Sequence, residues 1–191
     1  MPILITDRLI LRHFTEADAD DLAALHADPA VMRLIDDGRP VPPAVTATVT
    51  LPSILRDYRE LPPGQGQFAA VTRTGYRFLG WLSLRPASSV GLTAATGDLE
   101  LGYRLHPADW GRGYATEGAR ALVRHAFLNL DAARVVATTM TVNTASRRVM
   151  EKAELRHVRT FHEDWPDPLP GAEHGDVEYA LARADWSAEI R

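Results

Sequence analysis

The feature that most constrains the fold is a strand pattern that passes through a glycine turn into a long amphipathic helix. The strand is "DLELGYRL" (98–105) and the turn is "WGRG" (110–113). Small residues at a helix start let an anion approach unpaired backbone N–H groups and the positive end of the helix dipole. The segment therefore predicts an anion-binding strand–turn–helix unit. After the turn, apolar residues recur on one helical face at Ala115, Ala119, Leu122, Val123, Ala126, Phe127 and Leu130.

Strand and helix patterns alternate along the rest of the chain. Helices are predicted at a capping box of Thr15 and Asp18, at Asp28-Pro29, and in "NTASRRVMEKA" with Ala145, Val149 and Ala153 on one face. Among the prolines of residues 40–64 we expect a broken helix at about 54–60 between mobile loops. One mixed α/β domain over residues 1–191 is the economical interpretation. Strands are predicted in "DRLILRHF", "QFAAVTRT", "RFLGWLSLR", "ARVVATTM", "VRTF" and "DVEYALAR".

Composition excludes several classes of protein. The chain has no cysteine, which rules out disulfides, thiolate zinc sites and a cysteine nucleophile. We see no secretory leader and no apolar run of membrane-spanning length, so we expect a cytoplasmic protein without a membrane partner. His162 and His174 share one loop, but two histidines do not make a metal site, and no metal is predicted.

Charge is unevenly distributed. Residues 111–160 carry a balance of +5 and residues 161–191 a balance of −6. This pattern suits an anionic cofactor and a cationic substrate, although charge counts alone favour ordinary solvated surface. The chain lacks the overall basicity and interleaved aromatics of a nucleic-acid binder, so no nucleic-acid partner is expected.

Two nucleotide-binding templates fail at their functional positions. Gly111 and Gly113 fit G-x-G-x-x-G, but the third glycine is replaced by Thr116. Gly113 and Gly118 have P-loop spacing, yet Ala119 and Arg120 replace the lysine and the hydroxyl. These failures disfavour an ATP- or NAD-binding domain.

The remaining pattern resembles the acetyl-CoA pyrophosphate loop of the GNAT superfamily of N-acetyltransferases, Q/R-x-x-G-x-G/A. Gly113 and Ala115 occupy its small positions, and Trp110 stands where Gln or Arg is usual. With "ELGYRLHPADWGRGYATEGARAL" and, one strand later, "NTASRRVMEKAEL", the chain is similar to the branch of ribosomal-protein alanine N-acetyltransferases (RimJ/RimL-like). The ending Ala153-Glu154-Leu155 departs from the common Leu/Ala-Gly-Phe/Leu. "TDRLILRHFTEADADDLAAL" and "DVEYALAR" extend the resemblance over nearly the whole chain.

The resemblance implies a fold and a cofactor site. The fold would be a single α/β domain with a mixed, mostly antiparallel sheet, a splayed strand pair and flanking helices. Pantetheine would pair with the exposed edge of "ELGYRL", with Leu105 as the backbone contact. Asn143 would bind the pantetheine arm, although helix capping alone would explain an Asn there. The pyrophosphate would lie on the N–H groups of Gly111, Arg112, Gly113, Tyr114, Ala115 and Thr116, to which Arg112 can add charge.

The implied reaction is direct acetyl transfer from acetyl-CoA to a primary amine in a ternary complex. The resemblance places Ser146 near the sulfur, where its hydroxyl would stabilise the departing thiolate. Two carboxylates compete for the role of general base: Glu100, which could also form a strand-edge salt bridge, and Glu163, which could also be a solvated loop residue. The acceptor would be a protein N-terminus or a small molecule, and the enzyme a monomer or homodimer. The alternative is a non-catalytic acyl-CoA-binding or sensing module of the same fold.

Overall fold

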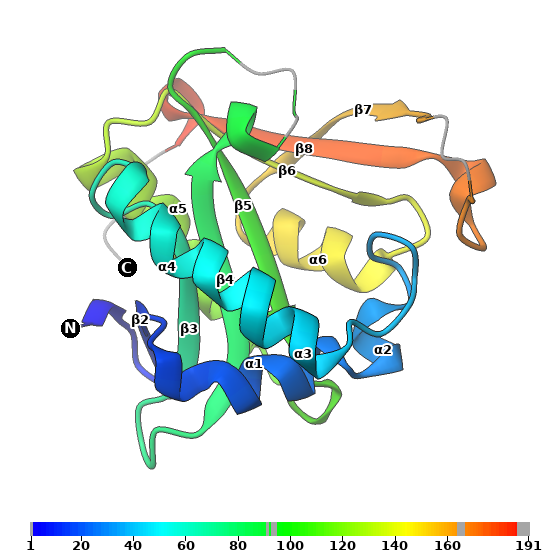
Figure 1. Ribbon diagram of the computed structural model, residues 1–191. Helices are drawn as coiled ribbons and strands as arrows, with labels where there is room; N and C mark the ends of the chain where they lie inside the picture. Colours follow the sequence, from blue (N-terminus) through cyan, green and yellow to red (C-terminus); the bar gives the residue numbers. More distant parts are fainter. Residues whose placement is uncertain (1, 91, 93–94, 164–166, 187–191) are drawn as a thin grey trace. The chain divides into compact units, whose positions relative to one another are not determined.

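A computed structural model describes residues 2–90, 92, 95–163 and 167–186, and in them one eight-stranded mixed sheet is flanked by helices (Figure 1). The strands are β1 (Pro2–Ile5), β2 (Leu9–His13), β3 (Gly66–Thr72), β4 (Phe78–Pro86), β5 (Asp98–Leu105), β6 (Arg134–Met140), β7 (Arg156–Phe161) and β8 (Asp176–Ala182). Their order is β1-β2-β3-β4-β5-β6-β8-β7. The pairs β1–β2, β2–β3, β6–β8 and β7–β8 are antiparallel, whereas β5–β6 is parallel. The predicted mixed, mostly antiparallel sheet is confirmed.

The helices begin and end close to the predicted signals, with one exception described below. Asp28 caps the second helix by accepting a hydrogen bond from the N–H of Ala30 at 2.8 Å, and Pro29 takes its first position. The helices are α1 (Ala19–His26), α2 (Pro29–Met32), α3 (Pro43–Val45), α4 (Leu51–Glu60), α5 (Tyr114–Asn129) and α6 (Thr144–Lys152). Short helical turns are η1 (Glu16–Asp18), η2 (Thr46–Thr50), η3 (Ala87–Val90), η4 (Pro107–Asp109), η5 (Ala172–His174) and η6 (Arg183–Asp185).

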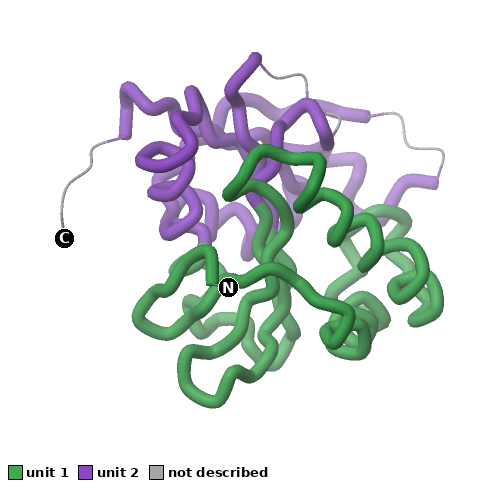
Figure 2. Tube along the Cα trace, turned by 60° about the vertical axis from the view of Figure 1, so that its left-hand side comes forward, with its two compact units in different colours: residues 1–83, 103–118 green, residues 84–102, 119–191 purple. Residues whose placement is uncertain are grey.

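The chain forms two compact units, coloured separately in Figure 2. Unit 1 comprises Met1–Ser83 and Tyr103–Gly118, and unit 2 comprises Leu84–Gly102 and Ala119–Arg191. Because β4, β5 and α5 each run through the boundary, the division does not separate consecutive stretches of sequence.

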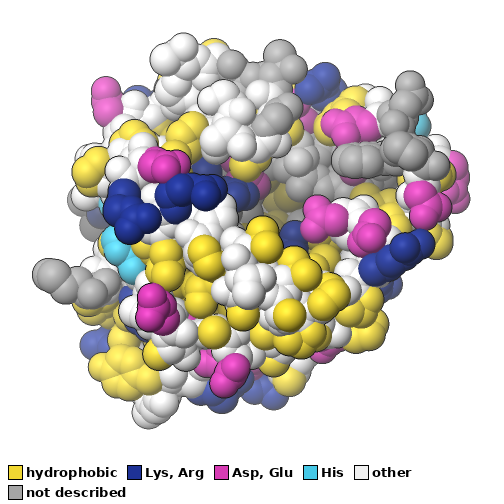
Figure 3. Space-filling view, in the orientation of Figure 1, with side chains coloured by type: hydrophobic (Ala, Val, Ile, Leu, Met, Phe, Trp, Pro, Cys, Tyr) yellow, Lys and Arg dark blue, Asp and Glu magenta, His cyan; other side chains and the backbone are white. Residues whose placement is uncertain are grey.

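In unit 1, helices α1 to α4 lie on one face of strands β2 to β4 (Figure 1). Alternating strand residues and residues three or four apart on the helices bury their apolar side chains between the two layers. Val45 and Val49 remain exposed on the helical run, and hydrophobic side chains gather over this part of the surface in Figure 3. The core contains Ile10, Phe14, Leu22, Leu25, Met32, Leu51, Ile54, Val71 and Trp81.

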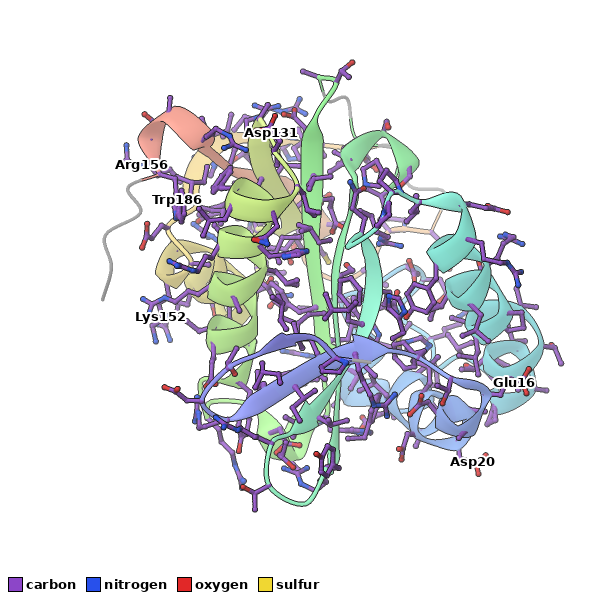
Figure 4. All side chains as sticks on the ribbon, turned by 90° about the vertical axis from the view of Figure 1, so that its left-hand side faces the viewer. Glu16, Asp20, Asp131, Lys152, Arg156 and Trp186 are labelled. Atoms are coloured by element: carbon purple, nitrogen blue, oxygen red, sulfur yellow. The ribbon has the colours of Figure 1, made fainter. Side chains whose placement is uncertain are left out.

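In unit 2, strand β8 pairs with β6 on one side and with β7 on the other, and Val135 on β6 and Leu181 on β8 are buried. The ring of Phe127 on α5 packs 5.2 Å from that of Trp186, which is labelled in Figure 4. Arg120 on α5 donates a hydrogen bond from Nε to the carbonyl of Lys152, at the end of α6, at 2.7 Å. These contacts fix both helices within unit 2.

Two sequence predictions are wrong in detail. The helix expected at about 54–60 instead runs from Pro43 to Glu60 through α3, η2 and α4. Pro52 is tolerated because η2 is a π-type turn, in which the N–H of Leu51 donates to the carbonyl of Thr46. On α6, Met150 and Ala153 are buried whereas Ala145 is exposed, so the apolar face is rotated from the predicted one.

Candidate active site

The predicted pyrophosphate loop is a left-handed turn directly before α5. Gly111 has φ +72° and Gly113 has φ +82°, a backbone conformation that side-chain-bearing residues rarely adopt. A Cβ atom at Gly111 would meet no described atom within 4 Å. The first four N–H groups of an α-helix have no partner within the helix, and those of α5 begin at this turn. Exposed glycines and helix-start N–H groups fit a phosphate group approaching the backbone.

Arg8 fastens the loop to the N-terminal strands. Its Nη1 donates to the carbonyl of Arg112 at 3.0 Å, and its Nε donates to Glu117 in the first turn of α5 at 2.6 Å. Glu117 also accepts hydrogen bonds from Oγ1 of Thr6 at 2.6 Å and from the Arg8 N–H at 2.9 Å. These hydrogen bonds lower the pKa of Glu117 against the opposing effect of burial, which is the largest single influence. The guanidinium of Arg8 further lies 4.7 Å from the ring centroid of Tyr114.

A second anchor lies just before the loop. Asp109 is buried and accepts two hydrogen bonds from Arg77, each 2.7 Å long. This fork holds the pKa of Asp109 below its usual range, so the carboxylate stays charged. Sequence reasoning missed Arg8, Arg77 and Asp109, because nothing in their local spacing links them to residues so far along the chain.

Leu105 presents its backbone away from β4. The next residue, His106, donates its N–H to the carbonyl of Leu79 on β4 at 2.9 Å. Since successive strand residues direct their N–H groups to opposite sides, the backbone of Leu105 faces the other way. Its carbonyl accepts a hydrogen bond from Nε1 of Trp110 at 2.7 Å. The tryptophan that departs from the usual motif therefore stabilises the strand end, and the N–H of Leu105 faces away from β4.

The side chains of the loop's last residues face the protein. Tyr114 and Ala115 pack against a cluster of Leu9, Leu79 and Leu105. They are consequently placed to offer a ligand their backbone rather than their side chains. Gly118, one turn later, lets α5 approach β4 closely, since a Cβ there would lie 2.6 Å from Leu82 Cδ2.

In unit 2, Asn143 caps α6, the structural role that sequence analysis held as the alternative. Its Oδ1 accepts a hydrogen bond from the N–H of Ser146 at 3.2 Å, and its Nδ2 donates to Oγ1 of Thr139 at 3.1 Å. Asn143 and Ser146 are thus brought together in the first turn of the helix. Ser146 is half-buried there.

Within unit 2, β5 pairs with β6 over 98–100 with 134–136. Strand β6 continues to Met140 and stays paired with β8. The end of the β5–β6 pairing at Glu100 agrees with the predicted splayed strand pair. Strands that separate leave backbone groups available for an added strand-like ligand.

Glu100 lies at the last paired position of β5. Its side chain is 14% exposed, and its Oε2 is 3.6 Å from Nη2 of Arg85. Burial raises the pKa of Glu100, and Arg85 opposes that shift only in part. Among the described residues, Oε2 of Glu100 and Nε of Arg85 are buried atoms without a hydrogen-bond partner. A buried carboxylate with a raised pKa has the properties of a general base.

Glu163 is in a different setting. It is exposed after the end of β7. Burial raises the pKa of Asp176, and the charge of Glu163 adds to that shift. Residues 91, 93–94 and 164–166 lie outside the described residues.

Two kinds of feature are absent from the described residues. No group of three or more His, Cys, Asp or Glu side chains that could hold a metal ion occurs there. Nor does that part of the chain contain a helix long and apolar enough to cross a membrane.

Comparisons with known proteins agree with this geometry. Residues 8–156 match the family model described as an acetyltransferase (GNAT) domain. A relative from Aspergillus fumigatus, "FsC-acetyl coenzyme A-N(2)-transacetylase", is 36% identical over 97% of this chain and 78% of its own. The chain therefore belongs to the GNAT family and is an acetyl-CoA-dependent N-acetyltransferase.

Solved structures share the fold. A GNAT-family acetyltransferase from Bacillus anthracis superposes with a TM-score of 0.76 at 21% identity, covering 95% of this chain and 98% of that one. RimL, a ribosomal L7/L12 α-N-protein acetyltransferase, gives a TM-score of 0.76 at 17% identity, covering 97% and 100% of the two chains. The predicted acetyltransferase fold is confirmed.

Proposed function

We propose that this enzyme acetylates the primary amine of a small molecule by direct attack on acetyl-CoA, with Glu100 as general base. The buried, unpartnered carboxylate oxygen of Glu100 carries the proposal, because it is suited to receive the amine proton. The Aspergillus relative, named for transfer to an N2 nitrogen and matching nearly the whole chain, favours a small-molecule acceptor over a protein N-terminus. A single acetyltransferase domain over residues 1–191 is part of the proposal.

Backbone and side-chain geometry supports the roles proposed for the cofactor residues. The N–H groups of residues 111–116 would hold the pyrophosphate, assisted by the charge of Arg112, and the backbone of Leu105 would pair with pantetheine. Asn143, whose side chain already caps α6, would use its remaining donor capacity toward the pantetheine arm.

The chemical step forms a C–N bond and breaks the C–S bond of the thioester. Glu100 takes the proton from the attacking nitrogen, and the Ser146 hydroxyl donates a hydrogen bond to the leaving thiolate. Glu163 remains the competing candidate for the base. We rank it second because it is exposed, whereas Glu100 is buried.

Glu100→Gln and Glu163→Gln distinguish the two bases. We expect Glu100→Gln to lower kcat by about 10²- to 10⁴-fold near neutral pH, with partial recovery as rising pH deprotonates the amine. Glu163→Gln is expected to stay near wild type. Steady-state kinetics with a panel of amines, followed by thiol release, would measure this. The reverse ranking would reassign the base to Glu163, and an unaffected Ser146→Ala would remove only the serine's role.

A further inference from the structure

The ion pair between Arg85 and Glu100 has an unusual geometry. Both side chains are largely buried, with 26% and 14% exposure, yet the closest oxygen and nitrogen are 3.6 Å apart. Every other described carboxylate that is less than a fifth exposed and pairs with an arginine does so at 2.6 to 2.8 Å: Asp18, Asp98, Asp109, Glu117 and Glu178. The nitrogen–oxygen distance between Arg85 and Glu100 is therefore longer than in each of these pairs.

The separation leaves hydrogen-bonding capacity unused. Nε of Arg85 and Oε2 of Glu100 are both buried without a partner in the described part of the chain. Leaving such groups unsatisfied is costly, so sites of this kind are normally completed by a polar group. A guanidinium only donates and an ionised carboxylate only accepts. The completing group must therefore offer an acceptor to Arg85 and an N–H or O–H donor to Glu100, and an amine that carries a neighbouring oxygen meets both requirements.

We propose that Arg85 and Glu100 together recognise the acceptor as an α-amino carbonyl compound. The amine donates to Glu100, and the carbonyl or carboxylate oxygen on the neighbouring carbon accepts from Nε of Arg85. Nη2 of the same guanidinium lies 3.6 Å from Oε2 of Glu100, so an amine and an oxygen joined through two carbons can contact both side chains. The inference rests on the proposed function, in which Glu100 receives the amine, and adds that Arg85 is a specificity-determining residue.

Matched amines test this directly on the wild-type enzyme. Alaninamide and ethylamine differ only in the carboxamide, as do leucinamide and isopentylamine, and kcat/KM is calculated for the unprotonated amine to remove differences in amine basicity. We expect the carbonyl-bearing member of a pair to be favoured by about 10- to 100-fold, since a hydrogen bond to a charged group is lost with its analogue. Equal values, or a preference for the plain amines, would overturn the proposal.

Variants then test whether the Arg85 side chain causes the preference for the carbonyl-bearing amine. Arg85→Met is expected to bring the ratio close to one, mainly by lowering kcat/KM for the amides. Arg159→Met is the matched control, because Arg159 also pairs with a glutamate in unit 2, Glu178, but at 2.8 Å with its hydrogen bond made. The control should keep the wild-type ratio. An Arg85→Met enzyme that loses activity equally on both members of a pair would show that Arg85 acts only on Glu100.

Failure of this inference differs from failure of the proposed function. An enzyme that acetylates amines without distinguishing the members of a pair is still an amine acetyltransferase, and only the role of Arg85 is lost. An enzyme that binds acetyl-CoA but acetylates no amine in the panel contradicts both. Thermal denaturation of each variant shows whether a lost ratio reflects folding, and the wild-type ratio does not depend on that outcome.

Discussion

Single residues decide how close a ligand can approach the loop. Gly113 has φ +82°, as does Gly75 in the turn between β3 and β4, and a Cβ at Gly75 would meet nothing within 4 Å. The same substitution at the two positions therefore imposes similar backbone strain, while only one of them is in the proposed phosphate site.

We predict that Gly113→Val raises the KM for acetyl-CoA by about tenfold or more, because a branched side chain strains the turn and covers the N–H groups. Gly75→Val should lower thermal stability about as much as Gly113→Val does, and it should leave the KM for acetyl-CoA unchanged. Initial-rate kinetics at saturating amine would compare them. A phosphate site elsewhere would be indicated by an unchanged KM in folded Gly113→Val.

His26 is a buried imidazole, and its protonation at acid pH should destabilise the folded protein. It is 4% exposed and accepts a hydrogen bond from Nε1 of Trp81 at 3.2 Å. Burial, with the nearby Arg104, lowers the pKa of His26 from 6.5 to about 4. The unfolded chain therefore binds more protons between these values, so this contribution is fully present above pH 6.5 and is lost as pH falls toward 4.

The shift corresponds to about 3 kcal/mol of unfolding free energy. We predict that lowering pH from 7 to 4.5 destabilises the wild type more than His26→Gln, which keeps an acceptor for Trp81 but does not titrate. Denaturant unfolding at several pH values gives the difference. Parallel pH profiles for the two proteins would contradict the assignment, whatever the carboxylates contribute to both.

At the scale of elements, the loop depends on a strand far away in the sequence. Arg8 precedes β2, yet it bonds the carbonyl of Arg112 and the side chain of Glu117, a residue 109 positions away. This places the start of α5 against the N-terminal strands. The hydrogen bonds of Arg8 therefore position the proposed phosphate site.

We predict that Arg8→Met raises the KM for acetyl-CoA about three- to tenfold with little change in kcat, since one charged hydrogen-bond network is lost at a partly exposed site. Arg73→Met is the control, because Arg73 also reaches this region, donating to the Thr6 carbonyl at 3.4 Å, but does not bond the loop. The effects of Arg8→Met and Glu117→Gln should be less than additive. Equal KM values for the Arg8 and Arg73 variants would rule out the positioning role.

For the whole molecule, the kinetic order of the two substrates follows from the available nucleophiles. The chain has no cysteine, and the sequence spacing suggests no Ser-His-Asp set. We predict intersecting double-reciprocal plots, as expected for a ternary complex, and no acetylated protein by mass spectrometry when acceptor is omitted. Parallel plots with a trapped acetyl-enzyme would overturn direct attack.

The sequence by itself determined the local elements and the family. The strand at 98–105, the turn glycines Gly111 and Gly113, and the Asn143 cap are encoded within a few residues, through side-chain period and backbone preference. The helix over Pro43–Glu60 differs from the predicted one because a π-type turn accommodates Pro52.

Tertiary structure alone decided which charges meet. Arg77 reaches Asp109 across 32 positions, and Arg85 faces Glu100 from a neighbouring strand without completing a hydrogen bond. Sequence spacing cannot specify such pairs, because partners distant in the chain become neighbours only through strand order and register. Burial, which raises the pKa of Glu100 and distinguishes it from the exposed Glu163, likewise exists only after the chain has folded.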